Sequence, residues 1–137
     1  MIKKIILAAC LLGIIAFPAV AQKPEDSKVV AYYFHGVMRC PTCHKLEQYS
    51  KEAIENNFKS ELISGKLEFK AVNVEVKGNE HFVNDYQLYT KSPVLSLVKS
   101  GKEVRSKNLA AIWELVGNKD KFSSYIKEEV AGFIKGQ

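Results

Sequence analysis

The sequence has little cysteine: three residues in a chain of 137, one of which, Cys10, lies in an apolar N-terminal segment. If that segment is removed, only Cys40 and Cys43 remain. One such pair cannot form the framework of several crosslinks that holds small secreted domains together. A bridge across two residues also restrains the unfolded chain little. The scarcity of cysteine therefore argues against a disulfide scaffold and indicates a reactive pair.

A strong excess of charge of one sign is also absent. Without residues 1–21, which carry Lys3 and Lys4, the chain keeps 18 basic and 15 acidic side chains, a net charge of +3. Its lysines alternate with acids, as in Lys51-Glu52 and in residues 127–129. This pattern is typical of a solvated surface and not of a basic stripe. We therefore expect no nucleic-acid partner.

A long apolar run occurs only at the N-terminus. Two lysines precede the apolar residues 5–16, and Pro18 and an A-x-A site that ends at Ala21 follow. This pattern predicts a secretory signal peptide over residues 1–21, because the run is short for a membrane span. An uncleaved anchor and a lipid on Cys10, within a lipobox-like sequence, are the two membrane alternatives. We expect a periplasmic or otherwise exported protein.

The rest of the chain is long enough for one domain. Residues 22–27 are polar and contain Pro24, which predicts a flexible leader, and residues 28–137 can bury a single core. We expect this domain to act as a monomer.

The first elements place the cysteines at the start of a helix. Residues 28–35 form a continuous β-branched and aromatic run, which predicts a strand buried on both faces, with Tyr32, Tyr33 and Phe34 as core residues. After the loop 36–39, Pro41 suits a first helical position, and apolar residues recur beyond it at helical spacing. This helix either breaks at residues 56–57 or continues to the Ser64-Gly65 stop.

The later pattern predicts a mixed sheet. Residues 67–76 read as a second strand, and an apolar face with Phe82, Val83, Tyr86 and Tyr89 reads as a helix. A hairpin follows, with a strand opened by Pro93 and a short partner around residues 103–105. A short helix over residues 109–116 holds Trp113, and the last helix is capped by Asn118 or Asp120. The order βαβα then ββα predicts an α/β fold with helices on both faces.

This order, with a Cys-x-x-Cys at a helix start and a proline that enters a hairpin about fifty residues later, resembles the thioredoxin superfamily. Residues 92–104 are similar to the cis-proline segment and hairpin of that family. The resemblance implies a thioredoxin fold in which Ser92 and Pro93 lie opposite the cysteines. Residues 32–36 with Arg39-Cys40-x-x-Cys43 also resemble small exported proteins labelled as nitrophenyl compound nitroreductase subunits of ArsF type. That resemblance implies a partner enzyme.

The sequence departs from thioredoxin itself at the cysteines. Thioredoxin carries Trp before the first cysteine and Gly-Pro between the pair, where this chain has Arg39 and Pro41-Thr42. The buried acid that thioredoxin has six residues before the first cysteine is Phe34 here. An acid at that position therefore cannot relay protons in this protein.

The residues support thiol–disulfide exchange. At a helix N-terminus the pKa of Cys40 should be lowered by the helix dipole, with Arg39 and His44 adding positive charge. Cys40 then attacks a disulfide and Cys43 resolves the mixed disulfide. The predicted neighbours of this pair are Arg39, Pro41, Thr42, His44, Ser92 and Pro93. We expect no cofactor, a disulfide-containing or dithiol protein substrate, and a redox partner that recycles the pair.

Two other interpretations of the cysteine motif stay open, a haem site and a metal carrier. Cys40-Pro41-Thr42-Cys43-His44 also has the form of a c-type haem attachment site, although the motif follows a buried strand. Met38 is too close in sequence to serve as the sixth haem ligand, so His81 would have to serve. Alternatively, Cys40, Cys43 and His44 could carry copper or zinc.

Overall fold

The computed structural model describes residues 26–137, so the predicted signal peptide 1–21 lies outside the described residues. The first strand, β1, spans Ser27–His35. It therefore begins at the last residue of the range that the sequence assigned to a leader.

Strand β1 lies inside a four-stranded sheet of order β2-β1-β3-β4. β2 (Leu67–Asn73) pairs with it in parallel, and β3 (Ser92–Lys99) pairs with it antiparallel. β4 (Lys102–Asn108) pairs antiparallel with β3 at the edge. A central strand with both faces covered has no exposed side, which explains the uninterrupted apolar run of β1.

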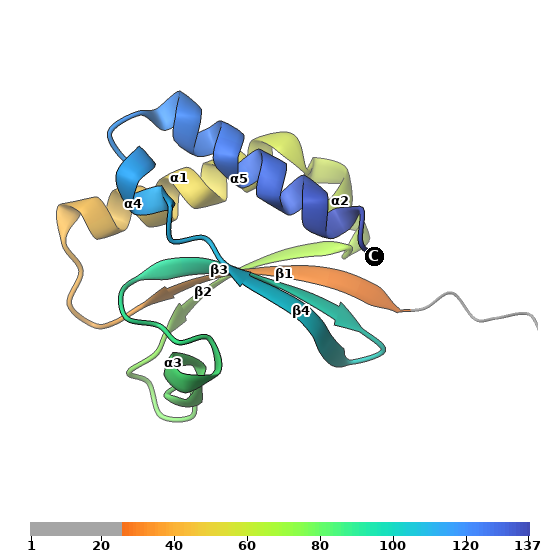
Figure 1. Cartoon of the computed structure of the whole chain (residues 1–137), viewed down its shortest axis with the longest axis horizontal. Coiled ribbons are helices and arrows are strands. Elements are labelled where there is room, and N and C mark those ends of the chain that lie inside the picture. The colour runs from red at the N-terminus through yellow and green to blue at the C-terminus, as the bar shows by residue number, and fades with distance from the viewer. Residues whose placement is uncertain (1–25) are drawn as a thin grey trace, which may run out of the picture.

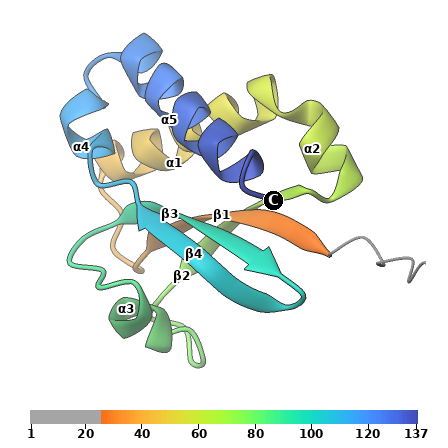
Figure 2. The same cartoon turned by 45° about the vertical axis from the view of Figure 1, so that its right-hand side comes forward.

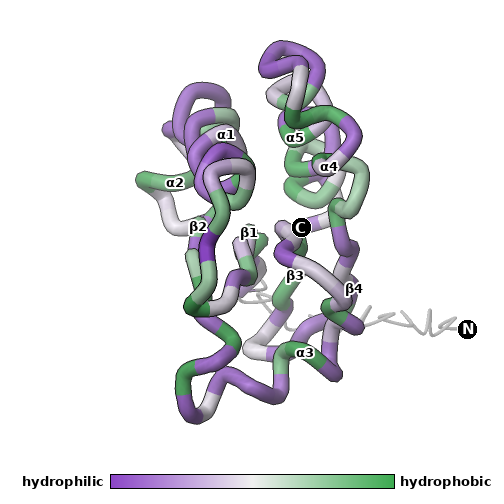
Figure 3. The backbone as a smooth tube through the Cα atoms, turned by 90° about the vertical axis from the view of Figure 1, so that its left-hand side faces the viewer, coloured by the Kyte–Doolittle hydropathy of each residue, from purple (hydrophilic) through white to green (hydrophobic). Residues whose placement is uncertain are grey.

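Helices cover both faces of the sheet, as predicted. α1 (Pro41–Asn57), α2 (Lys59–Ser64), α4 (Ile112–Leu115) and α5 (Lys119–Ile134) lie on one face. The single turn and a half of α3 (His81–Asp85) lies on the other face (Figures 1 and 2). Figure 3 shows α1 and α5 as neighbours above the strands, with α3 below.

The main core fills the space between the sheet and the pair α1 and α5. Tyr33 and Leu95 from the sheet, Leu46 from α1, and Phe122 and Ile126 from α5 are each no more than 1% exposed. Burial of such side chains contributes about 1.5–3 kcal/mol each relative to exposure. The core therefore fixes α1, and with it the cysteines, against β1.

The helix that begins at the cysteines is interrupted at Phe58 and then continues as a second helix. α1 ends at Asn57, the backbone of Phe58 leaves the helical region (φ −133°, ψ 38°), and α2 follows directly. The Phe58 side chain is 7% exposed and belongs to the core. Gly65, with φ 77°, ends α2 in a left-handed conformation that favours glycine.

Three predicted elements are shorter than expected. β2 ends at Asn73 and not at Val76, because the Asn73 side chain accepts a hydrogen bond from the Glu75 N–H at 3.0 Å and starts a turn. α3 ends at Asp85, and Tyr89 lies beyond it with 93% of its side chain exposed. The short helix within 109–116 has only the four residues of α4.

The cap of the last helix, α5, is Asn118 and not Asp120. Its side-chain oxygen accepts a hydrogen bond from the Lys121 N–H at 3.0 Å.

The strand order 2-1-3-4 is that of the predicted thioredoxin fold: a parallel βαβ unit is followed by an antiparallel ββα unit on the same sheet. The carboxyl end of β1 leads through a short loop into α1. The fold thus presents the N-terminus of α1 at the carboxyl end of the central strand β1. Within residues 26–137, every helix is too short or too polar to cross a membrane.

Candidate active site

Cys40 is the N-cap of α1, and Pro41 is its first residue. The backbone of Cys40 is extended (φ −80°, ψ 162°), and its Sγ accepts a hydrogen bond from the Cys43 N–H at 3.1 Å. A serine or aspartate oxygen ordinarily takes this place at an N-cap. The sulfur of Cys40 is thus held where free N–H groups and the helix dipole stabilise negative charge.

The two cysteines form a disulfide with a Cα–Cα distance of 5.0 Å. They differ in their surroundings, because Cys40 is exposed whereas Cys43 is only 2% exposed and packs in the first turn of α1. Approach from solvent is therefore open at Cys40 and closed at Cys43.

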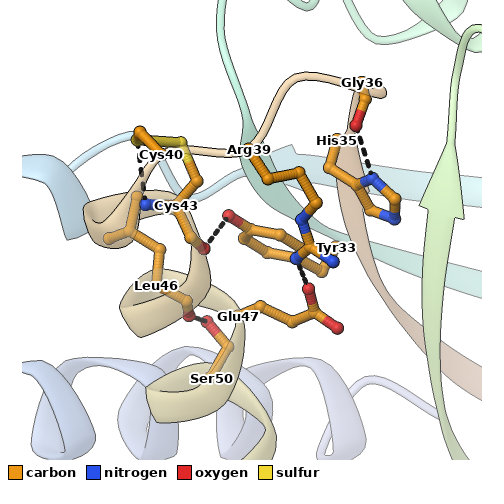
Figure 4. Close-up of polar contacts among 9 residues, drawn as sticks. All are labelled: Tyr33, His35, Gly36, Arg39, Cys40, Cys43, Leu46, Glu47 and Ser50. Atoms are coloured by element: carbon orange, nitrogen blue, oxygen red, sulfur yellow. Dashed lines mark hydrogen bonds and ion pairs between the residues drawn. A yellow bond between two sulfur atoms is a disulfide. The ribbon is translucent and has the colours of Figure 1, made fainter.

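Tyr33 supports the turn that carries Cys43 from below. Its ring is fully buried in β1, and its hydroxyl donates a hydrogen bond to the Cys43 carbonyl at 2.8 Å (Figure 4). Burial raises the pKa of Tyr33 to about 12, and the nearby Arg39 charge opposes this rise. The hydroxyl thus stays a donor at neutral pH. The sequence predicted a core residue here but not this contact, although a buried tyrosine hydroxyl requires a partner.

Arg39 forms an ion pair with Glu47, which lies four residues beyond Cys43 on α1. Figure 4 shows its guanidinium turned toward Glu47 and away from the two sulfur atoms. In this disulfide form, the Arg39 charge that the sequence placed beside Cys40 is paired with Glu47. The physical reason is burial: a guanidinium only 23% exposed requires a charged partner close to it. Sequence reasoning missed Glu47, whose only signal was its position one helical turn after Cys43.

A turn after β2 fixes the loop between β1 and α1. Gly36 is buried, and a Cβ at this position would overlap the Glu75 carboxylate. That carboxylate accepts a hydrogen bond from the Val37 N–H at 3.1 Å, and the His35 carbonyl accepts one from the Val74 N–H at 2.9 Å. The close approach of Glu75 therefore depends on glycine at position 36.

Ser92 and Pro93 are buried residues of β3. They pair with Phe34 and Tyr33 of β1, so the sheet places them next to the strand that contacts Cys43. The sequence left the isomer of Pro93 open, and residues 26–137 contain no cis peptide bond, so the resemblance to a cis-proline segment does not extend to the isomer. The extended backbone of β3 continues through Ser92 and Pro93, and a trans bond, the favoured isomer, is compatible with that extension.

The remaining predicted residues surround Cys40. Thr42 is half-buried, whereas Pro41 and His44 are exposed. Across the described part of the chain, no three His, Cys, Asp or Glu side chains are grouped so that they could hold a metal ion. His81, considered above as a haem ligand, lies on α3, where its Nδ1 is 2.6 Å from an Asp85 carboxylate oxygen.

No protein-family model and no curated protein matches the chain. Similar solved structures include several thioredoxins at low sequence identity. Fasciola hepatica thioredoxin is 22% identical, with 74% of this chain and 80% of that chain covered and a TM-score of 0.41. Deadhead, a germline-specific thioredoxin of Drosophila melanogaster, is 18% identical, with 70% and 82% covered and a TM-score of 0.42. Arabidopsis thaliana thioredoxin O2 is 14% identical, with 70% and 76% covered and a TM-score of 0.41.

The strand order gives the described part of the chain a thioredoxin fold, with a disulfide at the start of α1. A Cys-x-x-Cys pair in this setting supports thiol–disulfide oxidoreductase activity.

Proposed function

We propose that the protein is an exported thiol–disulfide oxidoreductase in which Cys40 attacks and Cys43 resolves. The observation that carries the proposal is the difference between the two sulfurs: Cys40 is exposed at the helix N-cap, and Cys43 is 2% exposed one turn inside. Attack needs an accessible thiolate, whereas resolution needs a neighbouring thiol that external reagents do not reach.

The reaction transfers two electrons. In the reduced protein, the Cys40 thiolate attacks one sulfur of a substrate disulfide; a Cys40–substrate bond forms, the substrate S–S bond breaks, and the released thiolate takes up a proton. Cys43, after loss of its proton, attacks the Cys40 sulfur; the Cys40–Cys43 bond forms and the second substrate thiolate leaves and is protonated. The protein is thereby oxidised and the substrate reduced. Reversal of both steps oxidises a substrate dithiol.

Exposed apolar side chains near Cys40 support the proposal of a protein substrate. Val37 and Met38 in the preceding loop are 67% and 81% exposed. Next to them lies a pocket of about 230 Å³, which Gly36 and the exposed Tyr89 help to line. Exposed apolar side chains beside a reactive group are typical of protein-binding surfaces. We propose that a disulfide-containing or dithiol protein docks there.

A recycling partner must restore the pair after each turnover. Outside the cytoplasm a dithiol protein would reduce it, or a disulfide protein would oxidise it, and the direction depends on the reduction potential of the couple. The resemblance to nitroreductase subunits motivates a second form of the proposal, in which Cys40 and Cys43 pass electrons to a partner reductase. The chemistry at the two cysteines is the same in both forms.

Trapping of substrates tests the proposal. Cys43→Ser leaves the attacking thiol but removes resolution, so it should accumulate mixed disulfides that non-reducing gels reveal and mass spectrometry identifies. Cys40→Ser should trap far fewer, and the double variant, which is the matched control, should trap none.

A metal carrier would behave differently, because both cysteines would be ligands and either substitution would weaken copper binding without adducts. A haem protein would show a Soret band that survives denaturation. If neither single variant accumulates adducts, the oxidoreductase proposal is wrong. Export is tested separately, by N-terminal sequencing of protein from the periplasmic fraction, where cleavage after Ala21 is expected.

A further inference from the structure

The two residues of the Arg39–Glu47 ion pair lie on either side of the disulfide in the sequence. Arg39 immediately precedes Cys40, and Glu47 lies one helical turn beyond Cys43, so the pair joins the two ends of the active-site turn. The two side chains are only 23% and 24% exposed. Water therefore screens this pair less than it screens the exposed ion pairs of the surface.

An arginine beside an N-cap cysteine ordinarily stabilises its thiolate and lowers its pKa. Here the guanidinium is turned toward the Glu47 carboxylate and away from the sulfurs (Figure 4). In the reduced protein, the Glu47 carboxylate and the Cys40 thiolate would therefore compete for the same cation.

Other charged and titratable groups lie near this ion pair. Arg39, Glu47, His44 and Lys51 line one surface depression together with Gln48, and Glu47 is the single carboxylate among these lining residues. From the sheet, Tyr33 faces Arg39 but stays neutral at physiological pH, since burial raises its pKa to about 12. Lys51 forms an ion pair with Glu55, with 3.7 Å between Nζ and Oε1, on the same helix.

We infer that Glu47 sets the reactivity of Cys40 by holding Arg39 away from it. This inference rests on the proposed function, with Cys40 as the attacking thiol. Glu47 is a positioning residue: it acts on the sulfur through Arg39. When its charge is removed, the guanidinium is free to approach the reduced Cys40, which stabilises the thiolate and makes the couple more oxidising.

The test is a double-mutant cycle with Glu47→Gln, Arg39→Gln and the double variant. The acid dissociation constant of Cys40 is measured from thiolate absorbance against pH, and the reduction equilibrium is measured against glutathione. Glu47→Gln should raise the dissociation constant about fivefold and shift the equilibrium toward reduced protein, a size typical of one charge contact near a protein surface. In the Arg39→Gln background the same substitution should have no effect.

The controls separate this role from a structural one. Glu55→Gln removes an exposed carboxylate from the same helix and should leave both quantities unchanged. Glu47→Asp keeps the charge and should stay close to the wild-type values. If Glu47→Gln does not fold, Arg39→Gln alone decides, since it should change the dissociation constant less than about twofold when Arg39 is already held away from the sulfur.

Several results would overturn the inference: no change in Glu47→Gln, an equal change with and without Arg39, or a large loss of acidity in Arg39→Gln. Failure of the proposed function has a different signature. In that case the Cys43→Ser variant traps no substrate, whatever the titrations give. If substrates are trapped and Glu47→Gln titrates like the wild type, only the role of Glu47 is wrong.

Discussion

The hydroxyl of Tyr33 donates a hydrogen bond to the backbone carbonyl of Cys43 at 2.8 Å. This bond joins the central strand of the sheet to the helical turn that carries the resolving cysteine. Because Tyr33 is fully buried, no water competes for the bond. The site is thus built on two rigid elements, β1 and α1, and not on a loop alone.

Tyr33→Phe should lower the free energy of unfolding by about 1 kcal/mol, the usual net contribution of one buried hydrogen bond. Urea unfolding of the oxidised protein measures the change. Tyr32→Phe is the matched control, because Tyr32 lies on the opposite face of β1, where its ring stacks on Phe34 at 5.1 Å. If Tyr32→Phe lowers the free energy of unfolding as much as Tyr33→Phe does, the hydrogen bond to Cys43 is not the cause of the Tyr33 effect.

The raised pKa of Tyr33 predicts a loss of stability at alkaline pH. Burial moves the pKa from 10.0 to about 12 in the folded protein. Between these values the unfolded chain ionises first and holds fewer protons, so the free energy of unfolding falls as pH rises from about 10 to about 12. Below that window the contribution is constant. Tyr33→Phe should show a shallower fall than the wild type, and equal slopes for the two proteins would contradict the assignment.

Local patterns predicted the parts of the fold that local chemistry controls. The apolar run of β1, the proline at the start of α1 and the hairpin after Pro93 each carry their signal within a few residues. The ends of β2 and α3 were wrong because apolar spacing continued past them. What ends β2 is the Asn73 side chain, which bonds the Glu75 N–H. The strand pattern through Val76 gave no sign of that turn.

The sequence predicted where the two cysteines lie in the site, but not the contacts around them. The position of Cys40 and Cys43 at the helix start followed from the motif, and the structure places them there. The contacts of Arg39 with Glu47 and of Tyr33 with Cys43 depend on how β1 packs beneath α1. The sequence alone does not specify that arrangement. For the same reason the sequence did not predict that Arg39 pairs with Glu47.

Gly36→Ala should weaken the loop before Cys40 through Glu75. The new methyl group would displace the Glu75 carboxylate and break its bond with the Val37 N–H, at a cost of about 1 kcal/mol. Glu75→Ala should cost a similar amount, because it removes the same bond. The double variant should cost no more than Glu75→Ala alone, since the methyl group then meets no carboxylate. Additive losses in urea unfolding would show that Gly36 matters for another reason, such as its own backbone freedom.

The last prediction concerns the unequal exposure of the two cysteines. After reduction, iodoacetamide at mildly acidic pH should modify Cys40 in strong preference to Cys43, and peptide mapping identifies the labelled residue. Two physical causes act in the same direction. Cys40 is exposed and its sulfur accepts the Cys43 N–H at the helix N-terminus, which favours the thiolate, the reactive form. Cys43 is 2% exposed, so reagent reaches it poorly and burial disfavours its ionised form. Unfolding in urea is the control, because both causes then disappear and the two thiols should react at similar rates. Preferential labelling of Cys43 in the folded protein would reverse the roles assigned to the two sulfurs.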